Sequence, residues 1–203
     1  IINGIKGAID FLKSEFRIEQ LANLPYENLL VPLSALFAVE DGVQFRLSED
    51  HRKQIVKWFW KSLFSRRFSA GTRKNTNRDI AEILKIKYGQ GSRLDAITVS
   101  LQPSFFLDNR FNIRSVNTKT FILLLAQKEP RSFISGTRVS LRSVLKTYNS
   151  KEFHHINPRA FVATLTEKKH DVNCLTNFCI ISKTDNNQLA GDKPSIYRTK
   201  MAD

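Results

Sequence analysis

The chain has 203 residues, a mass of 23.3 kDa and a formal net charge of +13. This length limits it to one domain or two small ones, and a hydrophobic content of 41% argues against wholesale disorder. The excess of Lys and Arg favours a polyanionic partner, most simply nucleic acid, because neutralising phosphates releases condensed counterions. Since a basic ribosomal or membrane-surface protein would carry the same charge, charge alone identifies no function.

The positive charge is concentrated in the middle of the chain. Residues 51–150 carry a net charge of +15, whereas residues 1–50 carry −4 and residues 151–203 carry +2. This asymmetry indicates one basic face. No signal peptide or bilayer-spanning apolar run is recognisable. Cys174 and Cys179 form no disulfide framework, so we expect buried thiols in a reducing compartment.

The first 150 residues are predicted to be mainly helical. A serine followed by two acidic residues, at 48–50, is typical of a helix start, and we expect a flexible basic loop at residues 71–75. Apolar residues recur at helical spacing in five segments, namely 4–21, 26–39 (interrupted by Pro32), 48–67, 77–88 and 115–127.

The last 53 residues have a different pattern. Residues 153–156 and 177–182 are short runs with strand propensity, and a helix is expected from Asn186, capped by Thr184 or Asp185. The predicted fold class is therefore mainly α. A helical, basic DNA-docking body at residues 1–150 is followed by a compact ββα module at residues 151–203.

Two adjacent histidines stand in the first predicted strand, in the sequence EFHHINP. Neighbouring residues of a strand point to opposite faces, so His154 and His155 cannot share one role by simple alternation. A strand end next to a proline relaxes this limit, and one imidazole is then able to face a metal while the other faces a substrate. The alternative is a pair of ordinary surface histidines.

The pattern His-His-Ile-x-Pro, followed by an Asn that opens the second strand and another Asn nine residues later, resembles the HNH (ββα-metal) nuclease motif. In that family a two-stranded ribbon and a helix hold one divalent metal. The resemblance implies that His154 and Asn186 are metal ligands, with Asn187 as the alternative if the register shifts by one. It also implies that His155 is the catalytic general base and that Asn177 braces the active-site loop.

The implied chemistry suits these residue types. A neutral imidazole accepts a proton from water near pH 7, and the metal holds the scissile phosphate. One imidazole and one amide leave the remaining coordination positions of the metal open to water and phosphate oxygens. This donor set favours Mg²⁺ or Mn²⁺. Because His154 stands where the family more often has Asp, Ni²⁺ and Zn²⁺ are alternatives.

The C-terminal segment, with Lys-Pro-Ser-x-Tyr at residues 193–197, resembles the nuclease region of GmrSD-type restriction endonucleases. Residues 25–32 and 58–64 are similar to the helical region that precedes it there. The resemblance implies a metal-dependent DNA endonuclease of a restriction or phage-defence system in a bacterial or archaeal cytoplasm, acting on double-stranded and sometimes modified phage DNA. That family carries a ParB-like nucleotide-hydrolysing domain with an Asp-Gly-Gln-Gln-Arg motif. The motif does not occur here and the chain begins with Ile1, so we expect the C-terminal part of such a protein or a standalone relative.

Basic residues are the candidate contacts to DNA phosphates. Trp58 and Trp60 are expected in the core rather than stacked on bases. The candidate DNA-binding residues are Arg66, Arg67, Arg73, Lys74, Arg159, Lys183 and Lys193. The competing functional hypotheses are a non-catalytic DNA-binding module with a decayed nuclease fold and, less favoured, a nuclease toxin or an RNase.

Overall fold

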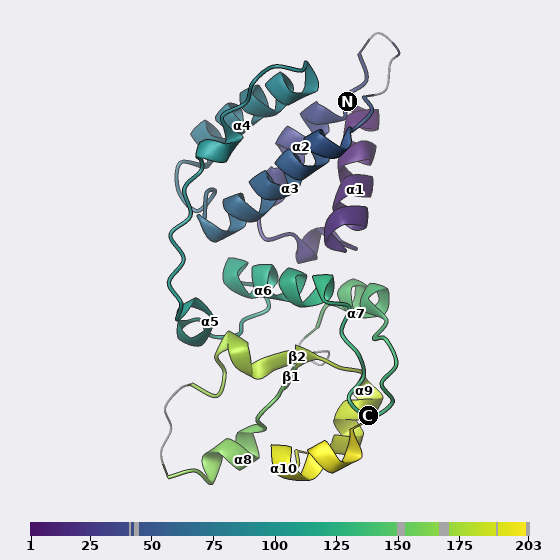
Figure 1. Cartoon of the computed structure of the whole chain (residues 1–203), viewed down its shortest axis with the longest axis vertical. Helices are drawn as coiled ribbons and strands as arrows, with labels where there is room; N and C mark the ends of the chain where they lie inside the picture. The colour runs from purple at the N-terminus through teal and green to yellow at the C-terminus, as the bar shows by residue number, and fades with distance from the viewer. Residues whose placement is uncertain (41, 43–44, 150–152, 167–170, 190, 202–203) are drawn as a thin grey trace. The chain divides into compact units, whose positions relative to one another are not determined.

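The computed structural model of the chain describes residues 1–40, 42, 45–149, 153–166, 171–189 and 191–201. Its contacts divide the chain into two compact units, unit 1 at Ile1–Leu101 and unit 2 at Gln102–Asp203 (Figure 1). This division lies about fifty residues before the domain boundary predicted from the sequence. The described residues are mainly helical with one small two-stranded sheet, which confirms the mainly α fold class. No helix among them has the length and apolar character required to cross a membrane.

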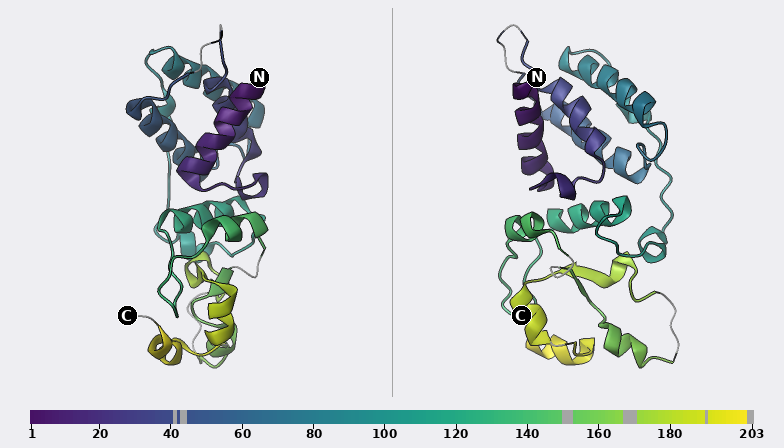
Figure 2. Two further views of the ribbon diagram at one scale, coloured as in Figure 1. Left: turned by 90° about the vertical axis from the view of Figure 1, so that its right-hand side faces the viewer. Right: turned by 180° about the vertical axis from the view of Figure 1, so that it is seen from behind.

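The regular elements described in unit 1 are all helices, and α2 packs against both α1 and α4 (Figures 1 and 2). The predicted helix start at Ser48 is confirmed, since the Ser48 hydroxyl accepts a hydrogen bond from the His51 amide at 3.2 Å. The elements of unit 1 are α1 (Ile2–Phe16), η1 (Leu21–Asn23), η2 (Glu27–Leu29), α2 (Leu30–Leu36), α3 (Glu49–Phe64), α4 (Thr72–Lys87) and η3 (Leu94–Ala96).

The core of unit 1 is built from aromatic rings and aliphatic side chains. Phe16 of α1 stacks on Phe59 of α3, with ring centroids 3.7 Å apart, and Trp58 is 1% exposed. The core interpretation of Trp58 is confirmed, while Trp60 is partly buried against Phe16 and Phe59. A side chain at Gly4 would collide with the Ser34 carbonyl, so the lack of a Cβ there lets α1 and α2 approach closely.

Unit 2 contains the predicted ribbon. Strands β1 and β2 pair antiparallel, with His154 opposite Cys179 and His155 opposite Phe178. The elements are α5 (Phe105–Asp108), α6 (Val116–Gln127), α7 (Leu141–Thr147), β1 (Phe153–His155), α8 (Arg159–Ala163), η5 (Leu175–Asn177), β2 (Phe178–Ile180), α9 (Lys183–Leu189), α10 (Pro194–Tyr197) and η6 (Arg198–Lys200).

The ribbon of unit 2 shares its core with helices that lie before residue 150. Ile122 of α6 and Leu145 of α7 pack in one buried cluster with Phe153 of β1 and Phe178 of β2. Phe111 stacks on Phe178, with centroids 4.0 Å apart. The ββα segment is therefore not a separate globule at residues 151–203, because α6 and α7 cover one face of its ribbon.

Two predicted boundaries are wrong. Helix α9 begins at Lys183, three residues before Asn186, because the Ser182 hydroxyl accepts a hydrogen bond from the Asp185 amide at 3.0 Å and starts the helix there. Helix α4 begins at Thr72, so most of the expected basic loop is helical. The side chain of Asn75 donates to the Arg67 carbonyl at 2.7 Å and ties this helix start to the preceding turn.

The two cysteines are free thiols, as expected, and both lie in unit 2. Cys174 is buried before η5, and Cys179 is partly buried in β2. Burial raises the pKa of Cys179 to about 12. This thiol is therefore protonated and unreactive at neutral pH.

Candidate active site

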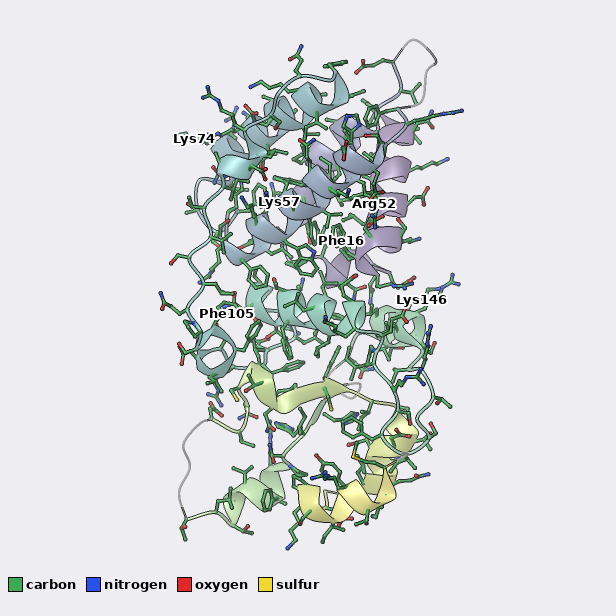
Figure 3. The ribbon with its side chains drawn as sticks, in the orientation of Figure 1. Phe16, Arg52, Lys57, Lys74, Phe105 and Lys146 are labelled. Atoms are coloured by element: carbon green, nitrogen blue, oxygen red, sulfur yellow. The ribbon has the colours of Figure 1, made fainter. Side chains whose placement is uncertain are left out.

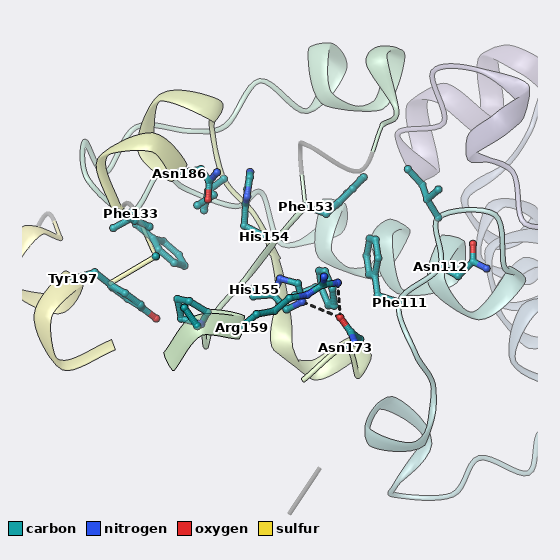
Figure 4. Close-up of a pocket in the computed structure, with 17 residues that line it drawn as sticks. Phe111, Asn112, Phe133, Phe153, His154, His155, Arg159, Asn173, Asn186 and Tyr197 are labelled. Atoms are coloured by element: carbon teal, nitrogen blue, oxygen red, sulfur yellow. Dashed lines mark hydrogen bonds between the residues drawn. The ribbon is translucent and has the colours of Figure 1, made fainter. Parts of the chain in front are cut away.

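A cavity of about 780 Å³ lies beside the ribbon of unit 2 (Figure 4). Its lining includes three of the predicted catalytic and metal-binding residues, His154 and His155 of β1 and Asn186 of α9. Residues from segments far apart in the chain complete it, among them Phe111, Phe133, Arg159, Asn173, Gly191 and Tyr197. The fold thus brings both histidines and the predicted amide ligand to one cavity.

The two histidines are directed to different parts of this cavity. Figure 4 shows His154 on the side where Asn186 lies, and His155 on the side of Arg159 and Asn173. This separation follows from the alternation of side chains along β1. Asn187, the alternative ligand, is exposed on α9 and is not part of the cavity lining.

His155 is held by a ring contact and a hydrogen bond. Its imidazole packs on Phe178, with ring centroids 4.3 Å apart, and its Nε2 lies 3.2 Å from Oδ1 of Asn173. Burial lowers the pKa of His155, and the nearby Arg159 charge lowers it further, while the hydrogen bond to Asn173 opposes both. The neutral imidazole, which is able to accept a proton, is therefore favoured at neutral pH.

The side chain of Asn177 forms hydrogen bonds to two segments beside the site, at Asn157 and Val172. Its Oδ1 accepts hydrogen bonds from the backbone amide of Asn157 at 2.8 Å and from the side-chain amide of Asn157 at 3.1 Å. Its Nδ2 donates to the Asn157 carbonyl at 3.1 Å and to the Val172 carbonyl at 2.8 Å. The side chain is 7% exposed, so this buried amide fixes the segment that directly follows His155.

Helix α9 is anchored by a buried carboxylate. Asp185, 4% exposed, accepts a hydrogen bond from the Ser132 hydroxyl and another from the Ile134 amide at 3.3 Å. The Tyr197 hydroxyl donates to the Ile156 carbonyl at 2.9 Å and joins α10 to the end of β1. These contacts position the helix that carries Asn186.

The predicted DNA-binding residues occupy different environments. Arg66, Arg73 and Lys74 are exposed in unit 1, and Figure 3 shows Lys74 directed away from the helices. Arg159 and Lys193 lie in unit 2; Arg159 lines the cavity and Lys193 is exposed. The side chain of Lys183 lies outside the described residues.

Arg67 differs from the other predicted DNA contacts, because its guanidinium belongs to the core of unit 1. It forms an ion pair with Asp79, with Nη2 and Oδ1 2.6 Å apart and side-chain exposures of 12% and 0%. The Trp58 indole donates to the same carboxylate at 3.1 Å. Arg67 is thus a structural residue, since a phosphate would have to displace this buried carboxylate.

Two functional-site residues were not recognised in the sequence. Asn173 contacts His155 although 18 positions separate them, and Asp185 contacts Ser132 across 53 positions. The only sequence signal for Asn173 is its position four residues before Asn177, which specifies no contact. Both assignments require the tertiary structure.

No group of three or more His, Cys, Asp or Glu side chains within the described part of the chain is arranged to hold a metal ion. The predicted ligand pair has a different composition, one imidazole from His154 and one amide from Asn186. No protein-family model, curated protein or solved structure matches this chain.

Proposed function

We propose that unit 2 is a metal-dependent endonuclease of the ββα-metal (HNH) kind that hydrolyses phosphodiester bonds of DNA. The observation that carries this proposal is the cavity lined together by His154, His155 and Asn186, on an antiparallel ribbon followed by a helix. A cavity that joins a partly buried, neutral imidazole to further polar groups is suited to hydrolytic chemistry.

His155 acts as the general base. Its neutral imidazole takes a proton from water, the hydroxide so formed attacks phosphorus, and the bond from phosphorus to the leaving ester oxygen breaks. Arg159 reaches the same cavity, where its guanidinium is suited to bind a phosphate oxygen. Asn177 holds the segment after His155 in place, so the base needs little reorganisation during the reaction.

The donor set fits a hard divalent cation. His154 and Asn186 line the same side of the cavity and would hold it, leaving other coordination positions for phosphate and water. Mg²⁺ or Mn²⁺ is preferred, with Ni²⁺ and Zn²⁺ as alternatives because one ligand is an imidazole. When bound, the cation supplies charge stabilisation at the phosphate and leaving oxygen.

Duplex DNA is the proposed substrate, and a restriction or phage-defence system is the proposed setting. The positive charge of residues 51–150 supports a phosphate-binding role. Arg66, Arg73 and Lys74 are exposed and available for this contact. In unit 2, Arg159 and Lys193 are exposed as well.

Metal-dependent nicking of a supercoiled plasmid tests this proposal, and two neighbouring amides provide a matched pair of variants. We expect Asn186→Ala to lower Mn²⁺ affinity and nicking by about 10- to 100-fold, because a ligand is lost. Asn187→Ala, on the exposed face of α9, should leave both within about twofold. Mn²⁺ binding is measured by titration calorimetry and nicking by gel assay.

Chelation by EDTA should stop nicking by the wild-type protein. Equal loss in both asparagine variants would contradict the assignment of Asn186. Tight, salt-dependent DNA binding with no cleavage under any divalent metal would favour the decayed-module alternative. Parallel assays on duplex DNA, single-stranded DNA and RNA separate a DNA endonuclease from an RNase.

The salt dependence of DNA binding tests the role of unit 1. We expect the triple variant Arg66→Ala, Arg73→Ala, Lys74→Ala to reduce the slope of log affinity against log salt concentration by about 2 to 3, because each lost phosphate contact removes about 0.9. Fluorescence anisotropy with a labelled duplex measures this. The control Lys6→Ala, Lys13→Ala, on the exposed face of α1, should leave the slope unchanged. An unchanged slope in the triple variant would rule out these contacts.

A further inference from the structure

The amide of Asn173 has one orientation that satisfies all its neighbours. Its Oδ1 accepts a hydrogen bond from Nη2 of Arg159 at 2.7 Å, and a guanidinium is only a donor. Its Nδ2 donates to Oδ1 of Asp171 at 3.2 Å, and a carboxylate is only an acceptor. Two charged groups at opposite ends of the amide therefore establish that its oxygen faces His155.

This orientation determines which ring nitrogen of His155 carries the proton. An amide oxygen donates nothing, so the contact of 3.2 Å is a hydrogen bond only if Nε2 of His155 is the donor (Figure 4). A neutral imidazole has one N–H, and Nδ1 is then the nitrogen with the free lone pair. The carbonyl oxygen of Asn173 has two lone pairs, so it accepts from Arg159 and His155 together.

We propose that Asn173 is a positioning residue that holds His155 in the Nε2–H tautomer and so makes Nδ1 the atom that accepts the proton from water. The catalytic consequence rests on the proposed nuclease function, whereas the tautomer itself does not. Stacking on Phe178 limits the tilt of the same ring. The nitrogen that acts as base is thus selected by a neighbour 18 positions further along the chain.

The position of Asn173 is itself well determined. Its backbone amide donates to Oδ1 of Asp171 at 2.8 Å, and its carbonyl accepts from the Phe111 amide at 2.7 Å. Asp171 in turn forms an ion pair with Arg110, with Nε and Oδ2 2.8 Å apart. Both the backbone and the side chain of Asn173 are therefore fixed before any substrate binds, which is the condition for a positioning role.

The test reads the tautomer directly. In ¹⁵N-histidine-labelled, metal-free protein at about pH 8.5, where imidazoles are neutral, long-range ¹H–¹⁵N correlations distinguish Nε2–H from Nδ1–H. The His155 signals are identified by their absence in His155→Gln. We expect Nε2–H in the wild type and a mixture of tautomers in Asn173→Ala, which lacks the acceptor. Asn112→Ala, another amide of the cavity lining, should leave the spectrum unchanged.

Cleavage kinetics complete the test. Asn173→Ala should lower kcat by about 10- to 100-fold with KM within about twofold. An Nδ1–H signal in the wild type, or an unchanged tautomer and kcat in Asn173→Ala, would overturn the proposal. The wild-type spectrum and its assignment with His155→Gln do not depend on Asn173→Ala, so they decide the tautomer even if Asn173→Ala fails to fold. The expected spectra without cleavage by the wild type would refute the nuclease function and the catalytic consequence, while the tautomer assignment would stand.

Discussion

In the His155→Ala variant, DNA cleavage is expected to fall by about 10²- to 10⁴-fold, the usual contribution of a general base. DNA affinity and folding should be retained. The imidazole is only partly buried, and Oδ1 of Asn173 keeps its hydrogen bond from Arg159 when the ring is removed. The substitution therefore leaves no buried acceptor unpaired, which is the usual cause of a large loss of stability.

Three measurements separate a catalytic defect from a structural one. Single-turnover cleavage gives the rate, anisotropy with a labelled duplex gives the affinity, and thermal unfolding gives the stability. Added free imidazole should restore part of the activity by occupying the space that the side chain leaves. EDTA-insensitive cleavage that persists in the purified variant would exclude His155 as the base.

Replacing Arg67 with Met should lower the free energy of unfolding of unit 1 by about 3–5 kcal/mol, because it leaves a buried charge uncompensated. Three hydrogen bonds join the guanidinium to Asp79, at 2.6, 2.8 and 3.0 Å. The carboxylate is fully buried and retains only the Trp58 indole as a described side-chain donor after the substitution. The same change at the exposed Arg73 should alter stability by less than about 0.5 kcal/mol.

Chemical denaturation measures the free energy of unfolding of both variants. We expect their DNA affinities to rank in the opposite order to their stabilities. Arg73→Met should weaken binding while remaining stable, and folded Arg67→Met should bind as the wild type does. The double variant Arg67→Met, Asp79→Leu should recover part of the lost stability, because it removes the unpaired charge. Equal stability of the two single variants would show that the buried ion pair contributes little.

Local chemistry explains which elements of the fold were predictable. The helix start at Ser48 was recognised because the capping hydroxyl and the amide from which it accepts lie three positions apart, at 3.2 Å, and Ser115 caps α6 at the same spacing and distance. The start of α9 was predicted too late because Ser182 belongs to the predicted strand 177–182. The hydrogen bond from the Asp185 amide to the Ser182 hydroxyl is apparent only in the folded structure. The domain boundary was placed too late because no local pattern indicates that α6 and α7 pack on the ribbon.

The basic residues illustrate the same difference at single positions. Arg66, Arg67, Arg73 and Lys74 are indistinguishable in sequence, since each is a cation in a basic run. Burial separates them, because Arg67 alone of these four is seen paired with a buried carboxylate, that of Asp79, while the other three are exposed. Charge counting predicts a basic region correctly, but it does not identify which cations are available to a phosphate.

The sequence by itself supplied the candidate residues, namely the adjacent histidines, Asn177 and Asn186, because the histidines are neighbours in one strand and the two asparagines stand nine positions apart. Tertiary structure alone decided how His155 is held. The contact to Asn173 forms only when residues 110–111 and 171–174 lie together, and no spacing rule specifies such a contact. Local sequence specifies which groups are present, while packing between distant segments specifies which atoms face one another.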